Sequence, residues 1–249
     1  GVRCPWDAKA GSGRLPPLME RFGFVGLPNA GKSSLYNALA GGGALAAPYA
    51  FATVDPNVGV AKVLDSRLDA LAEMSKSKNV IPTAVQFVDI AGLVKGASQG
   101  EGLGNRFLAH IREVDATVFV LRAFEDTDVP GSSDPAEQLE ILELELITAD
   151  LEAMEKHIDK RRKAARSNPV LAPEVAAMEA AIDVLGAGTP VWRAGLGDDT
   201  LALLKAEQLL TSKPVIVLVN LGEDQLEEPD AHLAGVRELV GDTAPVIGL

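Results

Sequence analysis

The segment from Gly26 to Ser33 reads G-x-x-x-x-G-K-S, a pattern whose lysine and hydroxyl side chains suit the binding of a nucleoside triphosphate. Its glycines let the backbone turn tightly, so that successive N–H groups can point at one phosphate group. Lys32 should face the surface and reach the β- and γ-phosphates, where it acts in catalysis, and the Ser33 hydroxyl should bind Mg²⁺. The residues predicted to hold the phosphates are Asn29, Ala30, Gly31, Lys32, Ser33 and Ser34.

The flanking sequence supports a true phosphate-binding loop. The apolar run 22–25 predicts a buried strand before the loop, and residues 34–40 predict a helix after it. The N-terminus of that helix would add its partial positive charge. The alternative is a glycine-rich turn that contains a lysine by chance, and the strand–loop–helix context disfavours it.

Two further residues are expected on the magnesium side of the site. The predicted strand 83–89 ends on Asp89, and a carboxylate in that place should hold Mg²⁺ through water. Thr53 lies in the loop before a predicted strand at 58–63 and is the expected third metal-side residue, although it can also be an ordinary loop threonine. Asp89 opens a D-x-x-G motif, in which the Gly92 amide should bond the γ-phosphate and so take part in catalysis.

The sequence Asn220–Leu–Gly–Glu223 follows a predicted buried strand, where a GTPase carries its guanine-reading N-K-x-D. Leu221 replaces the lysine, and Glu223 stands at the aspartate position with one more methylene. A carboxylate placed for guanine is thereby lost or displaced, while Asn220 and nearby backbone can serve adenine. We therefore predict that Asn220, Leu221 and Glu223 form the base site and that ATP is preferred over GTP. The alternative is that Glu223 faces solvent and selectivity is slight.

The order of predicted elements indicates an α/β fold with a mostly parallel sheet flanked by helices. We expect a P-loop domain at 19–130 and 200–249, incomplete at its C-terminus, and a disordered leader at 1–18. Residues 131–199 are expected to be an inserted antiparallel helical hairpin, a coiled coil. The remaining predicted strands are 116–122, 213–220 and 244–249, and the remaining predicted helices are 65–74, 105–114, 199–210 and 230–239.

The predicted hairpin has an apolar seam and a basic cluster. The seam residues recur at spacings of three and four, and they are Leu144, Ile147, Leu151, Met154 and Ile158, then Val175, Met178, Ile182 and Leu185. Near the tip are Lys156, Lys160, Arg161, Arg162, Lys163 and Arg166. This basic cluster indicates contact with RNA or another acidic partner. A solvated helix end with favourable cations is the alternative.

Composition narrows the setting in which the chain works. The net charge of −12 disfavours nucleic-acid binding over the whole surface but leaves a local basic patch possible. Cys4 is the single cysteine, so no internal disulfide partner exists, which favours a reducing compartment. No apolar run reaches the length of a membrane span, so we expect a cytoplasmic location and no membrane partner.

These segments together resemble the YchF/Obg-like ATPase family of P-loop proteins. The resemblance rests on the sequence at 26–33, 51–59, 89–98, 100–105 and 220–223. It implies a Ras-like nucleotide-binding domain with a helical hairpin inserted in it, Mg²⁺-dependent and slow ATP hydrolysis, and an association with ribosomes. It also implies a C-terminal TGS domain, which is not recognised here and suggests a truncated sequence. Two alternatives remain open, a GTPase of the same fold and a nucleotide-dependent ribosome-binding scaffold with negligible turnover.

The residue that positions the attacking water is not evident. Leu93 stands where many switch GTPases carry a glutamine, and the family shares this apolar replacement. Family members often have a histidine in the strand after Asp115, and Phe119 stands there instead. His110 is the nearest histidine in sequence, and its place on a predicted helix favours a structural role. Catalysis would then depend on Mg²⁺, Lys32 and backbone groups.

Overall fold

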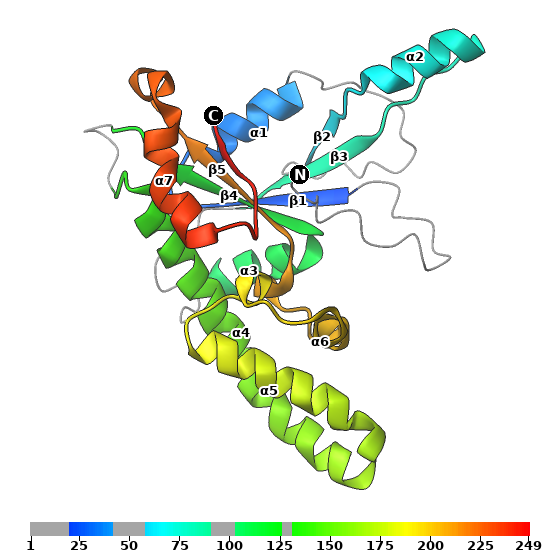
Figure 1. The fold of residues 1–249 in the computed structure, drawn as a ribbon, viewed down its shortest axis with the longest axis vertical. Helices are drawn as coiled ribbons and strands as arrows, with labels where there is room; N and C mark the ends of the chain where they lie inside the picture. The colour runs from blue at the N-terminus through cyan, green and yellow to red at the C-terminus, as the bar shows by residue number, and fades with distance from the viewer. Residues whose placement is uncertain (1–19, 42–57, 91–102, 126–130) are drawn as a thin grey trace.

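The computed structural model describes residues 20–41, 58–90, 103–125 and 131–249. Its centre is a six-stranded sheet in the order β2-β3-β1-β4-β5-β6 (Figure 1). The strands are β1 (Glu20–Val25), β2 (Val58–Lys62), β3 (Ala84–Asp89), β4 (Ala116–Arg122), β5 (Val215–Asn220) and β6 (Val246–Gly248). The six predicted strands are confirmed within one or two residues at most ends. Because β2 alone is antiparallel to its neighbour, the carboxyl ends of the other strands share one edge of the sheet.

The described ranges contain seven α-helices. They are α1 (Lys32–Gly41), α2 (Ser66–Ser75), α3 (Leu103–Glu113), α4 (Pro135–Ser167), α5 (Ala172–Gly186), α6 (Asp198–Leu204) and α7 (Pro229–Val240). The described ranges also contain five short 3₁₀ turns, namely η3 (Pro169–Leu171), η4 (Val191–Arg193), η5 (Lys205–Glu207), η6 (Leu210–Ser212) and η7 (Glu223–Glu227). The predicted helix at 199–210 is wrong beyond Leu204, because Gln208 has a φ of 51° and turns the chain out of the helix.

The sheet separates two apolar layers. On one face, α1 contributes Leu35 and Leu39, which pack against Phe24, Val118 and Val120. The other face is covered by α3, α4 and α7, in a larger core that includes Ile111, Leu139, Leu142, Phe119 and Val236. Every residue of β4 is buried, as a strand covered on both faces requires. This helix–sheet–helix sandwich confirms the predicted α/β class.

Helix α4 belongs to two parts of the molecule at once. Asp134 caps its N-terminus by accepting the Ala136 N–H at 2.9 Å. Its first half packs on the sheet, and its second half packs with α5 in a separate apolar cluster, so that the two helices project as a hairpin (Figure 1). Ile147, Met154 and Ile158 are buried as predicted, but Leu144 is 59% exposed, so its assignment to the seam is wrong.

The sheet and hairpin therefore share one continuous helix, and the domain boundaries at 130/131 and 199/200 stay predictions. No helix in the described ranges combines the length and apolar character that crossing a bilayer requires.

Candidate nucleotide-binding site

The loop between β1 and α1 is shaped by two glycines that no larger residue can replace without strain. A Cβ on Gly26 would lie 2.4 Å from the Val120 carbonyl oxygen of β4. A Cβ on Gly31 would lie 2.3 Å from Asn220 Nδ2, and Gly31 has a φ of 95°. Asn29 also lies in the left-handed region, with a φ of 62°. The loop thus passes close to the sheet and turns sharply into the helix N-terminus, where first-turn N–H groups have no intrahelical partner.

Lys32 is buried, which corrects the prediction that it faces the surface. Only 7% of the residue is exposed, and its ammonium donates hydrogen bonds to the carbonyl oxygens of Gly26 at 3.0 Å and Leu27 at 2.8 Å. Burial lowers the pKa of Lys32, and the nearby Asp89 carboxylate opposes that shift. The lysine therefore braces its own loop, and reaching a phosphate would require it to exchange these carbonyl oxygens for phosphate oxygens.

Two of the three predicted magnesium-side residues meet at the end of β3. Ser33 Oγ donates a hydrogen bond to Asp89 Oδ2 at 2.9 Å. A hydroxyl and a carboxylate oxygen are ligands that Mg²⁺ prefers, and both lie beside the helix N-terminus where phosphates would sit. These residues fit a magnesium ion, although the described residues contain no cluster of three or more carboxylate, histidine or cysteine ligands. Thr53 and Gly92 lie outside the described residues.

Asn220 joins the predicted base site to the phosphate loop. Its Nδ2 donates to the Ala30 carbonyl oxygen at 3.3 Å, across 190 positions of sequence. Ala30 is buried, while Asn29 and Ser34 are exposed at the surface of the loop. The amide thus holds the loop against the end of β5. Sequence reasoning placed Asn220 near the base but missed this contact, which only the parallel pairing of β1, β4 and β5 creates.

Leu221 and Glu223 point to different environments. The Leu221 side chain is buried in the core that also contains Leu233, and its N–H donates to the Leu249 carbonyl oxygen at 3.0 Å. Its side chain therefore does not lie over a base as the lysine of N-K-x-D does. Glu223 is exposed at the start of η7, which is the placement that the alternative of slight selectivity expects.

The turn that carries Glu223 is held by a residue that sequence reasoning did not single out. Gln225 accepts the Gly222 N–H at 2.8 Å and donates to the Ala123 carbonyl oxygen at 3.0 Å. A glutamine three residues after a helix-start position is the spacing of a capping box, and that spacing could have pointed to it.

Neither Phe119, which stands in place of the family's histidine, nor His110 is placed to position a water molecule. Phe119 is 1% exposed inside the core, and His110 is exposed on the surface of α3. Leu93 lies outside the described residues. A water-positioning side chain is therefore not identified among the described residues.

The basic cluster of the hairpin separates into two groups, and the first is engaged in ion pairs. Arg161 contacts Glu174 at 3.0 Å and Glu207 at 3.3 Å. Arg162 contacts Glu179 at 2.9 Å. These pairs join α4 to α5 and to η5, so the two arginines have a structural use.

The second group points to solvent. Lys160, Lys163 and Arg166 are exposed, and none of them forms an ion pair within 4.0 Å in the described part of the chain. Lys156 is also exposed and lies 3.9 Å from Glu152, a weak pair one helical turn away. The cations available to a partner are thus fewer than the sequence indicated.

Comparison with known proteins identifies the family. The sequence model described as 50S ribosome-binding GTPase matches residues 21–167, more than half of the chain. The protein named ribosome-binding ATPase YchF from Bacillus subtilis is 44% identical over 232 residues, which is 90% of this chain. Its counterpart from Escherichia coli is 41% identical over 229 residues. This chain spans 63% of the length of either relative.

The solved structure of the Schizosaccharomyces pombe YchF GTPase superposes with a TM-score of 0.78 and 34% identity. The match covers 95% of this chain and 66% of that one. The names of these relatives differ on the nucleotide, since two are called ATPases and one a GTPase. The chain belongs to the P-loop family of 50S ribosome-binding GTPases and is similar, within it, to the YchF proteins.

Proposed function

We propose that this chain is the nucleotide-binding part of a magnesium-dependent switch that binds and slowly hydrolyses ATP and works on ribosomes in the cytoplasm. The observation that carries the choice of ATP is the position of Leu221. Its side chain is buried in the core, and Glu223 is exposed on a separate turn. Neither residue presents the lysine and aspartate that guanine needs, while the amide of Asn220 remains at the site.

The residues have distinct roles in this proposal. Backbone N–H groups of the loop from Asn29 to Ser34 bind the phosphates, and Lys32 neutralises charge that develops during hydrolysis. Ser33 would hold the Mg²⁺ ion directly and Asp89 would hold it through water, with Thr53 joining them when the nucleotide is bound. The ion would supply neutralisation of the negative charge on the phosphates. The Gly92 N–H bonds the γ-phosphate and senses its loss.

Lys160, Lys163 and Arg166 on the hairpin contact ribosomal RNA in this proposal. Two observations support this contact. The three side chains are exposed on one projecting element of an otherwise acidic chain, and the names of the relatives state ribosome binding. Two or three phosphate contacts would give an affinity that falls with rising salt.

Phosphate release measured with ATP and with GTP, each with and without Mg²⁺, tests the enzymatic part of the proposal. We expect slow release that requires Mg²⁺ and is faster with ATP. Faster release with GTP would make the chain a GTPase, as the S. pombe relative is named. Tight nucleotide binding with no release from either nucleotide would make it a nucleotide-dependent scaffold.

A further inference from the structure

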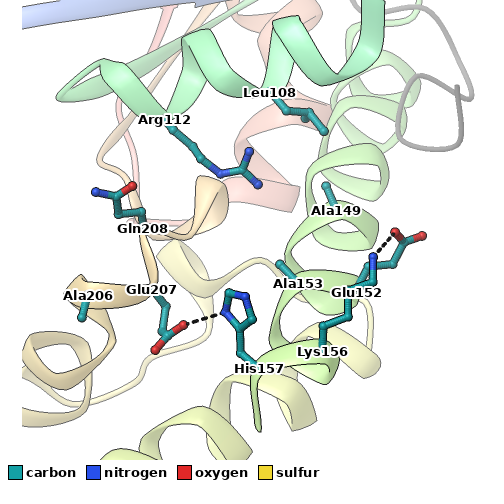
Figure 2. Close-up of a pocket in the computed structure, with 10 residues that line it drawn as sticks. All are labelled: Leu108, Arg112, Ala149, Glu152, Ala153, Lys156, His157, Ala206, Glu207 and Gln208. Atoms are coloured by element: carbon teal, nitrogen blue, oxygen red, sulfur yellow. Dashed lines mark hydrogen bonds and ion pairs between the residues drawn. The ribbon is translucent and has the colours of Figure 1, made fainter. Parts of the chain in front are cut away.

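A cavity of about 510 Å³ lies where α3, α4 and η5 meet (Figure 2). Leu108 and Arg112 reach it from α3, and Lys156 lines it from α4. Glu207 and Gln208 close it from η5 and the turn that follows. None of these residues belongs to the nucleotide site, so the cavity is separate from that site.

Arg112 is the cation with donors to spare in this cavity. Its guanidinium extends from the last turn of α3 toward α4 (Figure 2), and within the described ranges no hydrogen bond or ion pair within 4.0 Å engages it. Its backbone is fixed, because Lys213 Nζ donates to the carbonyl oxygens of Arg112 at 3.0 Å and Val114 at 2.5 Å. These bonds hold the backbone of the last turn of α3, from which a planar fork of N–H donors extends into the open cavity.

The acidic groups around Arg112 are engaged elsewhere. Glu207 pairs with His157 at 3.2 Å and with Arg161 at 3.3 Å. Glu152 lies 3.9 Å from Lys156 in a weak, exposed pair, which a phosphate bound to Lys156 would replace.

Buried Asp150, whose charge Arg112 also feels, faces η6 rather than the cavity. Its carboxylate accepts the N–H groups of Leu210 and Thr211 at 2.9 and 2.8 Å, and the Thr211 hydroxyl at 2.7 Å. An oxyanion in the cavity would therefore meet Arg112 without displacing an existing partner of that residue.

The cavity continues a row of lysines on α4. Lys156, Lys160 and Lys163 are spaced at i, i+4 and i+7, so they lie along one face of the helix. Successive members are about 4.5 to 6 Å apart along the helix axis. Lys156, the first of the row, lines the cavity, so the row leads from the projecting hairpin to Arg112.

We propose that the cavity is a phosphate subsite for an RNA strand. Arg112 binds one phosphate with its guanidinium fork, and the adjoining phosphates follow Lys156, Lys160 and Lys163 along α4. This inference rests on the proposed contact between the hairpin and RNA, and it adds α3 to that interface.

The test is a fluorescence anisotropy titration of a short, fluorescein-labelled double-stranded RNA with the whole chain over a range of salt concentrations. Arg112→Gln should weaken binding roughly tenfold and lower the salt slope by about 0.7 to 0.9, the value of one lost phosphate contact. Arg67→Gln, a matched change on exposed α2, should alter neither quantity. Arg112→Lys should keep the wild-type slope, because it still neutralises one phosphate.

The following outcomes of the titration would overturn the subsite. In one outcome, Arg112→Gln binds RNA with wild-type affinity, while the triple variant with Lys160→Glu, Lys163→Glu and Arg166→Glu does not bind it. That result would rule out the subsite and keep the hairpin contact. If neither variant changes RNA binding, or if the wild-type chain does not bind RNA, both the subsite and the hairpin contact are ruled out. An Arg112→Lys slope equal to that of Arg112→Gln, at a native melting temperature, shows that the charge at residue 112 does not neutralise a phosphate.

Free phosphate is the other source of the same oxyanion. Inorganic phosphate titrated against ¹⁵N-labelled chain can be followed at the Arg112 side-chain Nε–H resonance. In the RNA subsite, labelled RNA should shift that resonance more strongly than inorganic phosphate at equal phosphate concentration. A shift with inorganic phosphate alone would make the cavity a site for the free ion and contradict the RNA assignment.

Discussion

Lysine side chains have opposite surroundings in the phosphate loop and in the hairpin. Lys32 is 7% exposed and is held by two carbonyl oxygens of its own loop. Lys160 and Lys163 are exposed on α4, with no ion pair within 4.0 Å in the described residues. The hydrogen bonds of the phosphate loop fix the position of the Lys32 ammonium, whereas the ammonium groups of Lys160 and Lys163 are free to bind a partner. A site built from backbone can therefore be inferred from a short motif, whereas a cluster of surface charges cannot.

The largest expected effect separates these two classes of lysine directly. Lys32→Ala should reduce hydrolysis by about a thousandfold, because it removes charge from the developing transition state. It should also cost about 1–2 kcal/mol of unfolding free energy, since the carbonyl oxygens of Gly26 and Leu27 lose their donor. Phosphate release and urea unfolding measure the two effects. Lys160→Ala is the matched control, and a comparable loss of hydrolysis in it would erase the contrast.

The second prediction tests the buried side of the base site. Leu221→Lys with Glu223→Asp restores N-K-x-D in sequence, but it places an ammonium in the core beside Leu233. We expect a loss of about 2–4 kcal/mol in unfolding free energy and no strong preference for GTP. Glu223→Asp alone changes an exposed residue and should leave stability unaltered. A stable double variant that prefers GTP would show that residue 221 can turn toward the base.

The third prediction divides the hairpin cations by their partners. Reversing Lys160, Lys163 and Arg166 to Glu should weaken ribosome association by about a hundredfold and reduce its salt dependence, at an unchanged melting temperature. Reversing Arg161 and Arg162 should instead lower the melting temperature, because their ion pairs with Glu174, Glu207 and Glu179 become repulsions. Cosedimentation with ribosomes measures the association, and thermal unfolding measures the stability of each variant. Equal ribosome loss in both variants, at equal stability, would contradict the division.

The smallest expected effect is a pH dependence of stability caused by Glu143, which lies on α4 near the point where this helix leaves the sheet. Burial raises the pKa of Glu143 to about 7, against the opposing charge of its partner Arg193. Between about pH 4.5 and pH 7 the folded chain retains a proton that the unfolded chain has lost, so stability should fall as pH rises through this window. The total loss of unfolding free energy across this window is on the order of 1–3 kcal/mol. Urea unfolding at a series of pH values measures this dependence. Glu143→Gln should flatten the plot of unfolding free energy against pH, and the control Glu238→Gln, an exposed residue, should not. An unchanged slope in Glu143→Gln would refute the assignment to Glu143.

The sequence predicted the parts of the site that depend on neighbouring residues. The strand that precedes Gly26, the helix that follows Ser33 and the carboxylate that ends β3 are local patterns, and the structure confirms their places. The burial of Lys32 was mispredicted, because it depends on how the loop folds back on itself. The Asn220–Ala30 contact spans 190 positions and depends on strand order, which no local pattern contains.

The hairpin was predicted less completely for the same reason. The partner of Arg161 in η5 is 46 positions away, so its ion pair was invisible to a reading of α4 alone. Leu144 matched the seam spacing but faces outward, since the first half of α4 turns a different face to the sheet. The break at Gln208 has no glycine or proline to signal it.

Paired titration of ATP and GTP against the wild-type chain, at one Mg²⁺ concentration, tests the central claim most directly. The buried Leu221 and exposed Glu223 predict that ATP binds at least about tenfold more tightly than GTP, because a guanine would leave its N–H donors without the carboxylate they need. A chain that binds GTP tenfold more tightly than ATP would contradict the assignment of Asn220, Leu221 and Glu223, and the ATPase proposal with it.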